Sequence, residues 1–271
     1  MTGSVIRPLD VESLKQQFES GVPFPFFSID DFLEPEFAAD VAAVYPSYAE
    51  ARGMGNEFSK LNERLKVQVT DYARFPSPVK RLADELSGAA WLEILERITG
   101  IPRLLADEQL AGGGMHLTGP GGRLDVHVDF NYLEDRKLHR RLNILVYLNP
   151  EWRPEWGGAI ELWDEDVSRC GQSFMPKFNR CVVFQTSEIS FHGVTPVTAP
   201  EGVVRKSFAG YYYTREAPPQ WDGTVHSTVF RARPAERFRR NVLMPLERLQ
   251  DGSRRSLQNV KRSLKKVLGR D

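Results

Sequence analysis

The sequence contains little cysteine. Only Cys170 and Cys181 occur among the 271 residues, and their spacing does not match a metal-binding cysteine pair. This scarcity argues against a disulfide-rich secreted scaffold and against a zinc site built from thiolates. We expect both cysteines to be reduced, with a disulfide across a hairpin as the alternative.

Long apolar runs are also missing. No stretch of about 18 apolar residues is available to cross a bilayer, and the first ten residues, MTGSVIRPLD, lack the charged and apolar regions of a secretory signal. The sequence therefore predicts a cytoplasmic protein without a transmembrane segment. Because 41% of its residues are apolar, the chain can bury one sizeable core.

Histidine is scarce as well, with five in the chain, and two of them stand in informative places. His127 and Asp129 share one face of a predicted strand, because successive side chains of a strand point to opposite faces. His192 follows 63 residues after Asp129, in a short apolar segment that is also typical of a strand. Two histidines and one carboxylate form the facial triad of non-haem Fe(II) oxygenases, which leaves positions open for cosubstrate and dioxygen. Asp125 has the same parity and is expected to be solvated, with a place next to the metal as the alternative. His116, His139 and His226 are expected to be structural or exposed.

A second candidate lies in the β-prone segment 203–213, VVRKSFAGYYY. Alternation places Arg205 and Ser207 on one face and Lys206 on the other. The planar fork of arginine binds a carboxylate through two parallel hydrogen bonds, which lysine cannot copy. Arg205 is therefore the candidate for an organic acid, and a surface arginine on an edge strand is the alternative.

Several ordered sequence blocks carry a family resemblance. They are IDDFLEPEF at 29–37, ITGI at 98–101, GGRLDVHVDF at 121–130, RRLNILVYLNPEW at 140–152, WGGAIELW at 156–163, SFHGVTPV at 190–197 and RKSFAGYY at 205–212. The segment 23–214 thereby resembles the prolyl 4-hydroxylase-like branch of the Fe(II)/2-oxoglutarate-dependent oxygenases. It is most similar to the ribosomal-protein prolyl hydroxylases, as a single catalytic domain.

The resemblance implies an iron site and a cosubstrate site. His127, Asp129 and His192 would hold Fe(II), and Arg205 with Ser207 would hold the distal carboxylate of 2-oxoglutarate. The candidate catalytic residues are His127, Asp129, His192 and Arg205. The implied cofactors are Fe(II), 2-oxoglutarate and dioxygen, and the resemblance also allows a supporting role for ascorbate.

One departure from the family pattern concerns the cosubstrate. Thr118 stands where the family often has a tyrosine that assists 2-oxoglutarate. Asn143 would face inward if Leu142, Ile144 and Val146 form the opposite apolar face, and it would then supply a compensating hydrogen bond. A polar residue satisfied within the sheet is the alternative for Asn143.

The implied activity is hydroxylation of an unactivated carbon, coupled to oxidative decarboxylation of 2-oxoglutarate to succinate and carbon dioxide. Because Asp129 is present, no ligand position is vacant for a halide, which favours hydroxylation over halogenation. The substrate is either a prolyl residue or a small molecule such as a natural-product intermediate. Two alternatives remain, a cupin-like metalloenzyme that does not use 2-oxoglutarate and a non-catalytic jelly-roll binding protein.

The predicted fold is mainly β with flanking helices (α+β), a double-stranded β-helix or jelly roll buttressed on one sheet by N-terminal helices. We expect an oxygenase domain over 1–216, helical over about 8–100 and a jelly roll over about 101–216. Capping and periodicity predict helices at 11–20, at 35–45, from 77 onward and at 89–99.

Two further segments are expected to shape specificity. The charged connection 131–140 follows the ligand strand directly and is either a lid or a solvated turn. Trp152, Trp156 and Trp163 either line a substrate groove or pack at the rim and core.

The remaining segment, 217–271, is predicted to be a basic extension. From residue 231 to the end it has 13 Lys and Arg against 4 Asp and Glu, so the neutral total hides a polarised chain. Apolar residues at helical spacing over 253–268 predict a basic amphipathic helix. Such a helix would bind an acidic partner or an anionic surface, or dock on the acidic body of the protein itself. Direct reading of nucleic acid is not expected, because no aromatic residues are interleaved for base stacking.

Overall fold

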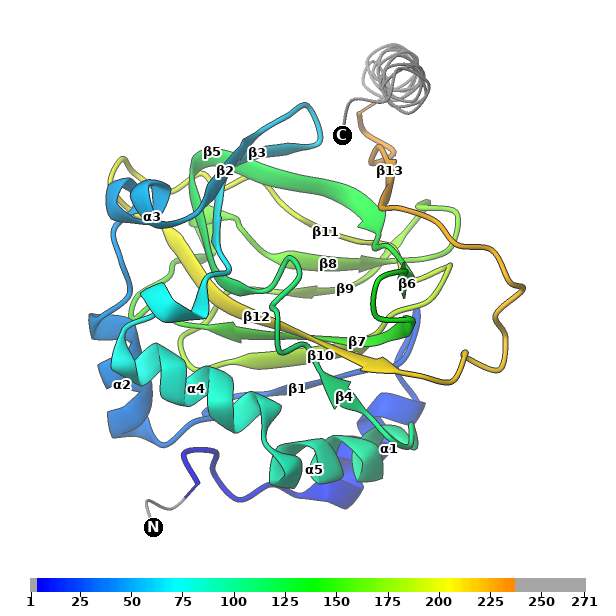
Figure 1. Cartoon of the computed structure of the whole chain (residues 1–271). Helices are drawn as coiled ribbons and strands as arrows, with labels where there is room; N and C mark the ends of the chain where they lie inside the picture. The colour runs from blue at the N-terminus through cyan, green and yellow to red at the C-terminus, as the bar shows by residue number, and fades with distance from the viewer. Residues whose placement is uncertain (1–3, 237–271) are drawn as a thin grey trace, which may run out of the picture. The chain divides into compact units, whose positions relative to one another are not determined.

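The computed structural model describes residues 4–236, in which antiparallel strands form a curled sheet with helices along one outer face (Figure 1). The strands are β1 (Phe26–Ile29), β2 (Asn56–Ser59), β3 (Glu63–Val69), β4 (Leu105–Ala106), β5 (Gly114–Val128), β6 (Tyr132–Leu133), β7 (Leu138–Tyr147), β8 (Ile160–Trp163), β9 (Cys170–Phe174), β10 (Cys181–Gln185), β11 (His192–Val194), β12 (Arg205–Thr214) and β13 (Val229–Arg231). Their main path runs β1-β10-β7-β12-β5-β11-β8-β9, while β3 also pairs β5 and β6 pairs β7.

The long strand β5 joins the two layers of this sheet. Its first part, Gly114–Thr118, pairs with β12, and its last part pairs with β11, where His127 lies opposite His192. Between them the backbone of Gly121 adopts a left-handed conformation (φ 78°), which favours glycine, and its N–H donates to Val197 O at 2.7 Å. The strand therefore bends and the sheet curls over itself, which confirms the predicted jelly roll.

The helices agree closely with the predicted ranges. Their bounds are α1 (Val11–Glu19), α2 (Pro35–Ala43), α3 (Tyr48–Met54), α4 (Ser77–Ser87) and α5 (Ala89–Thr99), with short 3-10 turns at Tyr72–Arg74 and Pro154–Trp156. α5 ends at Gly100, whose φ of 68° supplies the left-handed cap. α3 was not predicted from periodicity; it begins at Ser47, which forms a capping box with Glu50.

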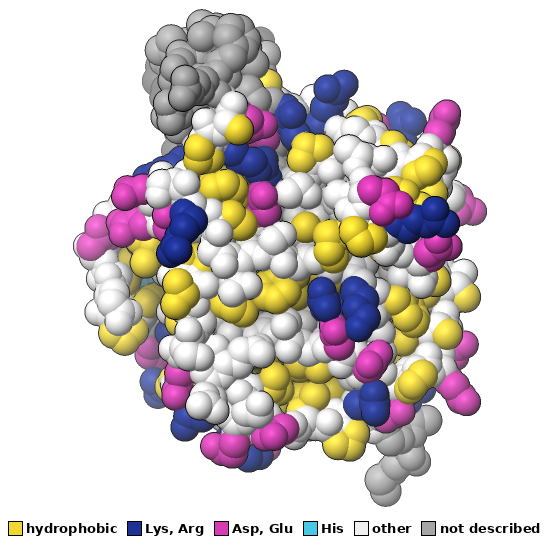
Figure 2. All heavy atoms as spheres, turned by 180° about the vertical axis from the view of Figure 1, so that it is seen from behind, with side chains coloured by type: hydrophobic (Ala, Val, Ile, Leu, Met, Phe, Trp, Pro, Cys, Tyr) yellow, Lys and Arg dark blue, Asp and Glu magenta, His cyan; other side chains and the backbone are white. Residues whose placement is uncertain are grey.

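The main apolar core lies between these helices and the outer face of β7 and β12. Leu142, Ile144 and Val146 of β7 are fully buried there, together with Phe208 and Tyr212 of β12. Because side chains alternate along a strand, the residues between them point to the interior of the roll. On the side opposite to the view of Figure 1, charged side chains of both signs are spread among apolar ones (Figure 2).

The structure corrects the expected subdivision of the chain. The range 8–100 is not only helical, because β1, β2 and β3 lie within it. β1 pairs β10 and β3 pairs β5, so residue 100 is not a boundary between a helical part and the sheet. Residues up to Phe230 group with the oxygenase unit, whereas the sequence predicted a boundary after Glu216. The predicted helix at 253–268 lies outside the described residues.

Two other expectations concern cysteines and membranes. Cys170 and Cys181 are both described, and no disulfide joins them. Cys181 is fully buried, and burial raises the pKa of its thiol well above the usual value. Within residues 4–236, every helix is too short or too polar to cross a bilayer.

Candidate metal and cosubstrate site

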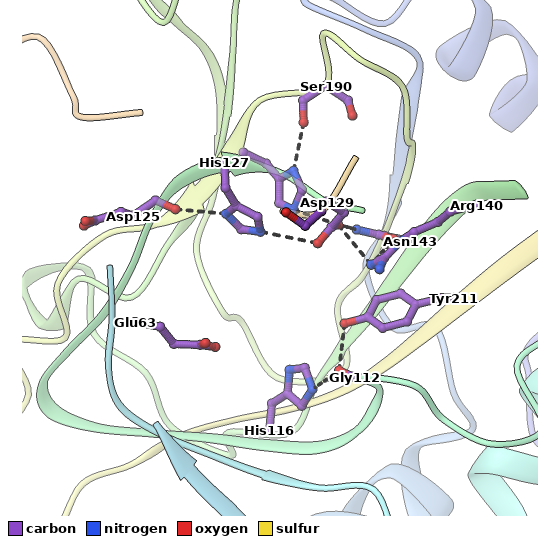
Figure 3. Close-up of polar contacts among 12 residues, drawn as sticks. Glu63, Gly112, His116, Asp125, His127, Asp129, Arg140, Asn143, Ser190 and Tyr211 are labelled. Atoms are coloured by element: carbon purple, nitrogen blue, oxygen red, sulfur yellow. Dashed lines mark hydrogen bonds and ion pairs between the residues drawn. The ribbon is translucent and has the colours of Figure 1, made fainter. Parts of the chain in front are cut away.

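His127, Asp129 and His192 converge at one end of the roll (Figure 3). His127 is near the end of β5, Asp129 follows that strand directly, and His192 begins β11, which pairs with β5 at this point. One ligand atom from each of the three residues lies within 4.8 Å of the others. The Nε2 atoms of His127 and His192 are 3.5 and 3.3 Å from the two carboxylate oxygens of Asp129.

Backbone carbonyls orient both imidazoles. Nδ1 of His127 lies 2.9 Å from Asp125 O, and Nδ1 of His192 lies 2.9 Å from Ser190 O. A carbonyl oxygen only accepts, so each Nδ1 carries a hydrogen and each Nε2 faces Asp129. Metal-binding histidines are held in the same way, through a hydrogen bond from the nitrogen that does not bind the metal.

The protonation states also suit a metal. Burial, followed by the neighbouring His127, lowers the pKa of His192. Burial alone would raise the pKa of Asp129, but Arg140 and His192 outweigh it and hold this pKa well below its usual range. At neutral pH the cluster therefore offers a neutral imidazole of His192 and a carboxylate. A set of imidazole and carboxylate donors fits a ferrous ion with open positions.

Arg205 lies inside the roll, as alternation predicts, with only 4% of its surface exposed. Its Nε donates to Gly158 O at 2.7 Å, and its Nη1 lies 3.4 Å from the hydroxyl of Ser207. Nη2 donates to the hydroxyl of Tyr147 at 3.2 Å. A buried guanidinium flanked by two hydroxyl groups fits the carboxylate of an organic acid.

The residues around Arg205 divide as the strand pattern requires. Lys206 points away from it, and its Nζ lies 3.5 Å from Tyr45 O. Thr118 is buried and lies directly opposite Arg205 in the pairing of β5 with β12. Tyr147 was not singled out from the sequence, although it shares the parity of Asn143 along β7. Continuing the alternation of inward-facing residues along this strand from Asn143 would have identified Tyr147.

Asn143 faces inward, but it lies beside Asp129 and not beside Arg205. Its Nδ2 donates to Asp129 Oδ2 at 2.8 Å, and its Oδ1 accepts from Arg140. Tyr147, next to Arg205, is four residues further along β7, roughly 13 Å away at the usual rise of a strand. Asn143 therefore contacts Asp129 in the metal cluster, and the β7 hydroxyl beside Arg205 belongs to Tyr147.

Arg140 was also missed by the sequence analysis. It is 3% exposed, and its Nη2 lies 2.9 Å from Asp129 Oδ2. Strict alternation from Asn143 would turn Arg141 inward instead. A register shift between β7 and β12, at Tyr212 and Tyr213, changes the parity and brings Arg140 to the interior.

Comparison with known proteins agrees with this geometry. Residues 113–213 match the family model of the 2OG-Fe(II) oxygenase superfamily, a range that contains His127, Asp129, His192 and Arg205. The chain carries a 2OG-Fe(II) oxygenase domain. Members of this superfamily use Fe(II), 2-oxoglutarate and dioxygen.

Individual relatives of the oxygenase domain include prolyl hydroxylases. Prolyl 3-hydroxylase OGFOD1 of Mus musculus is 33% identical over 84 residues, which are 30% of this chain and 15% of the mouse protein. The chain thus aligns with only a small part of that relative. A prolyl-4-hydroxylase of Pseudomonas putida shares the fold at a TM-score of 0.50 and 18% identity, over 74% of this chain and 99% of the other. The carbocyclase SnoK from nogalamycin biosynthesis shares it at a TM-score of 0.52 and 13% identity, over 76% and 87% of the two chains.

The segments beside the oxygenase site are tied together by hydrogen bonds. The connection 131–140 is a hairpin in which β6 pairs with the start of β7, and the turn between them, with Glu134, Asp135 and Lys137, is exposed, as expected of a solvated turn. The Nδ2 atom of Asn131 donates to Glu188 Oε1 and to Thr224 O, both at 2.8 Å. Trp221 packs edge-to-face on His139 at 4.5 Å. Residues 217–230 therefore belong to the oxygenase unit and not to a separate extension.

Several other expected residues have structural surroundings. Asp125 was expected to be solvated, but it is fully buried and lies 3.4 Å from Arg123 Nε. Trp152 and Trp156 are half-buried and pack edge-to-face against each other, with ring centroids 5.6 Å apart, and Trp163 belongs to a small buried cluster. His116 is buried, and its ring contacts Gly112 O at 2.9 Å (Figure 3).

Proposed function

We propose that the protein is an Fe(II)- and 2-oxoglutarate-dependent dioxygenase that hydroxylates an unactivated carbon of a peptidyl proline. The observation that supports this most is the pairing of two sites in one interior, a cluster of His127, Asp129 and His192 and a buried guanidinium of Arg205. A site that binds only a metal would not need the buried guanidinium, and a site that binds only a carboxylate would not need the His–Asp–His cluster.

The roles of the residues follow from their contacts. His127 and His192 would bind iron through Nε2, and Asp129 would bind it through a carboxylate oxygen. When bound, the iron supplies the position at which 2-oxoglutarate and dioxygen meet. Arg205 would hold the distal carboxylate of 2-oxoglutarate, and the hydroxyls of Ser207 and Tyr147 can turn to donate to the same carboxylate.

The overall reaction balances without another reductant. 2-Oxoglutarate loses its C1 carboxylate as carbon dioxide and becomes succinate, which takes up one atom of dioxygen. The other oxygen atom enters the substrate, where a C–H bond becomes C–OH. Apolar rings flank the two imidazoles, with Phe184 4.7 Å from His192 and Phe230 5.4 Å from His127, and they would keep water from the reacting groups.

The choice of a prolyl substrate rests on the similarity to Prolyl 3-hydroxylase OGFOD1 of Mus musculus. A small-molecule substrate is the other outcome of the test, because one fold hosts many substrates.

The test is a search for products that gain one oxygen atom. The protein would be incubated with Fe(II), 2-oxoglutarate and air, with a library of proline-containing peptides in one arm and metabolite extracts in the other. We expect hydroxylated proline and a matching amount of succinate, both absent with the His127→Ala variant. A product that forms without 2-oxoglutarate would favour a cupin-like metalloenzyme. Metal-independent binding with no turnover in either arm would favour a non-catalytic jelly roll.

A further inference from the structure

One oxygen of Asp129 is engaged by two side chains of β7. Oδ2 accepts from Asn143 Nδ2 at 2.8 Å and lies 2.9 Å from Arg140 Nη2. Figure 3 shows both side chains approaching the carboxylate from the side of β7, while His127 approaches it from β5. We call Arg140 and Asn143 the carboxylate brace.

The brace is itself held firmly. Nε and Nη2 of Arg140 both donate to Oδ1 of Asn143, at 3.0 and 2.8 Å. The guanidinium stacks over the ring of Tyr211 at 3.6 Å and lies 4.7 Å from the ring of Phe130. Tyr211 is also the residue opposite Asn143 in the pairing of β12 with β7. An arginine packed between two rings and fixed by an amide has little freedom to turn away from Asp129.

The two oxygens of Asp129 therefore differ. Oδ2 accepts a hydrogen bond from Asn143, forms an ion pair with Arg140 and lies 3.3 Å from Nε2 of His192. Oδ1 lies 3.5 Å from Nε2 of His127 and has no contact with the brace. A carboxylate that bound iron through both oxygens would occupy a coordination position that the cosubstrate needs.

We propose that Arg140 and Asn143 are positioning residues that keep Asp129 a one-oxygen ligand of the ferrous ion, through Oδ1, so that 2-oxoglutarate finds its positions open. This inference rests on the proposed function. It also explains why a second buried cation stands at the metal end of the interior, far along β7 from Tyr147 and the cosubstrate end.

The prediction separates two affinities. Without the brace, Asp129 can bind the metal through both oxygens and no longer shares its charge with a guanidinium. The Arg140→Met variant should therefore bind Mn(II), a stable substitute for Fe(II), as tightly as the wild type or more tightly. Its affinity for 2-oxoglutarate in the Mn(II)-loaded state should fall about tenfold or more. General damage to the site would weaken both.

The experiment is calorimetry of Mn(II) and then of 2-oxoglutarate, without dioxygen, on folded variants. The visible absorption of the Co(II)-loaded protein reports the coordination number independently, and it should change with Arg140→Met. Arg140→Lys keeps a charged donor and should restore most of the affinity for 2-oxoglutarate. Arg141→Met is the matched control, because that neighbouring buried arginine donates to Thr214 and not to Asp129.

Two results would overturn the inference. One is a parallel loss of both affinities in Arg140→Met, and the other is unchanged 2-oxoglutarate affinity with an unchanged Co(II) spectrum. If Arg140→Met does not fold, Asn143→Leu removes the other donor to Oδ2 and carries the same prediction. A wild-type protein that binds no metal would instead refute the proposed function.

Discussion

The two faces of β7 and β12 differ more than any other neighbouring regions of the molecule. The outer face carries fully buried aliphatic and aromatic side chains against the helices, whereas the inner face carries Asn143, Tyr147, Arg205 and Ser207. Both sets are buried to a similar degree. The outer set is apolar and packed, and the inner set is polar and connected by hydrogen bonds.

This difference shows how one pair of strands can serve stability and chemistry separately. Burial of apolar area on the outer face stabilises the fold. The inner polar groups cost free energy to bury and are retained where their partners satisfy them. Substitutions on the two faces should therefore have different consequences. Three predictions test that separation, and a fourth concerns a surface ion pair outside both faces.

The largest expected effect is at the metal cluster. His127→Ala should abolish 2-oxoglutarate-dependent succinate formation, because it removes a ligand, while the protein remains folded. Succinate measured by mass spectrometry, together with thermal unfolding, would check this. A His127→Ala variant that is unfolded, or that is folded and still forms succinate, would contradict the claim that this residue serves chemistry and not stability.

The next effect is at the cosubstrate end. Arg205→Met should weaken 2-oxoglutarate binding by roughly 30-fold or more, since losing one partner of a buried charge pair costs about 2–5 kcal/mol. Binding of Mn(II) should change little. Lys206→Met is the control on the other face of the same strand. Equal effects of the two variants on calorimetric binding of 2-oxoglutarate would contradict the assignment.

On the outer face, the effect should fall on stability. Ile144 is fully buried, and Ile144→Ala should lower the free energy of unfolding by about 2–5 kcal/mol. The affinity of the folded protein for 2-oxoglutarate should remain. Urea unfolding and calorimetry measure the two quantities, and Ile144→Val should give a smaller loss of stability. A large loss of affinity at normal stability would show that the faces are not independent.

The smallest effect is at the surface, where Asp30 contacts Arg180 and Lys177. Hydrogen bonding from Arg180, opposed by partial burial and helped by Lys177, lowers the pKa of Asp30 from 3.8 to about 2. A lowered pKa stabilises the fold above pH 3.8, and that contribution is lost as the pH falls toward about 2. Because Asp30 is well exposed, Asp30→Asn should cost less than about 1 kcal/mol at neutral pH. Denaturant unfolding should show a smaller difference in the free energy of unfolding between wild type and Asp30→Asn near pH 3 than at neutral pH. A difference that grows on acidification would contradict the role of the Asp30 carboxylate.

Much of the fold was predictable because local signals were strong. Proline at the start delimited α2 and glycine at the end delimited α5. Strand alternation turned Arg205 and Ser207 inward together. The ligand spacing of His127 and Asp129 needed only the twofold period of a strand. The pairing of β11 with β5, which brings His192 to the same point, was implied by the resemblance and not by any local pattern.

The remaining features depended on nonlocal pairing. β1 and β3 lie among helices in the sequence, and only their pairing with β10 and β5 makes them part of the sheet. Arg140 reaches Asp129 because of a register shift that single-sequence alternation cannot reveal. Asp125 looked solvated because charged residues usually are, whereas Arg123 and the curl of the sheet bury it.

The central claim is that one interior holds both a metal and 2-oxoglutarate. The most direct test is calorimetric titration of 2-oxoglutarate, without dioxygen, into metal-free and Mn(II)-loaded protein. We predict tight binding only after Mn(II) is added, and loss of that binding in both His127→Ala and Arg205→Met. Equal binding with and without Mn(II), or binding that persists in both variants, would contradict the account.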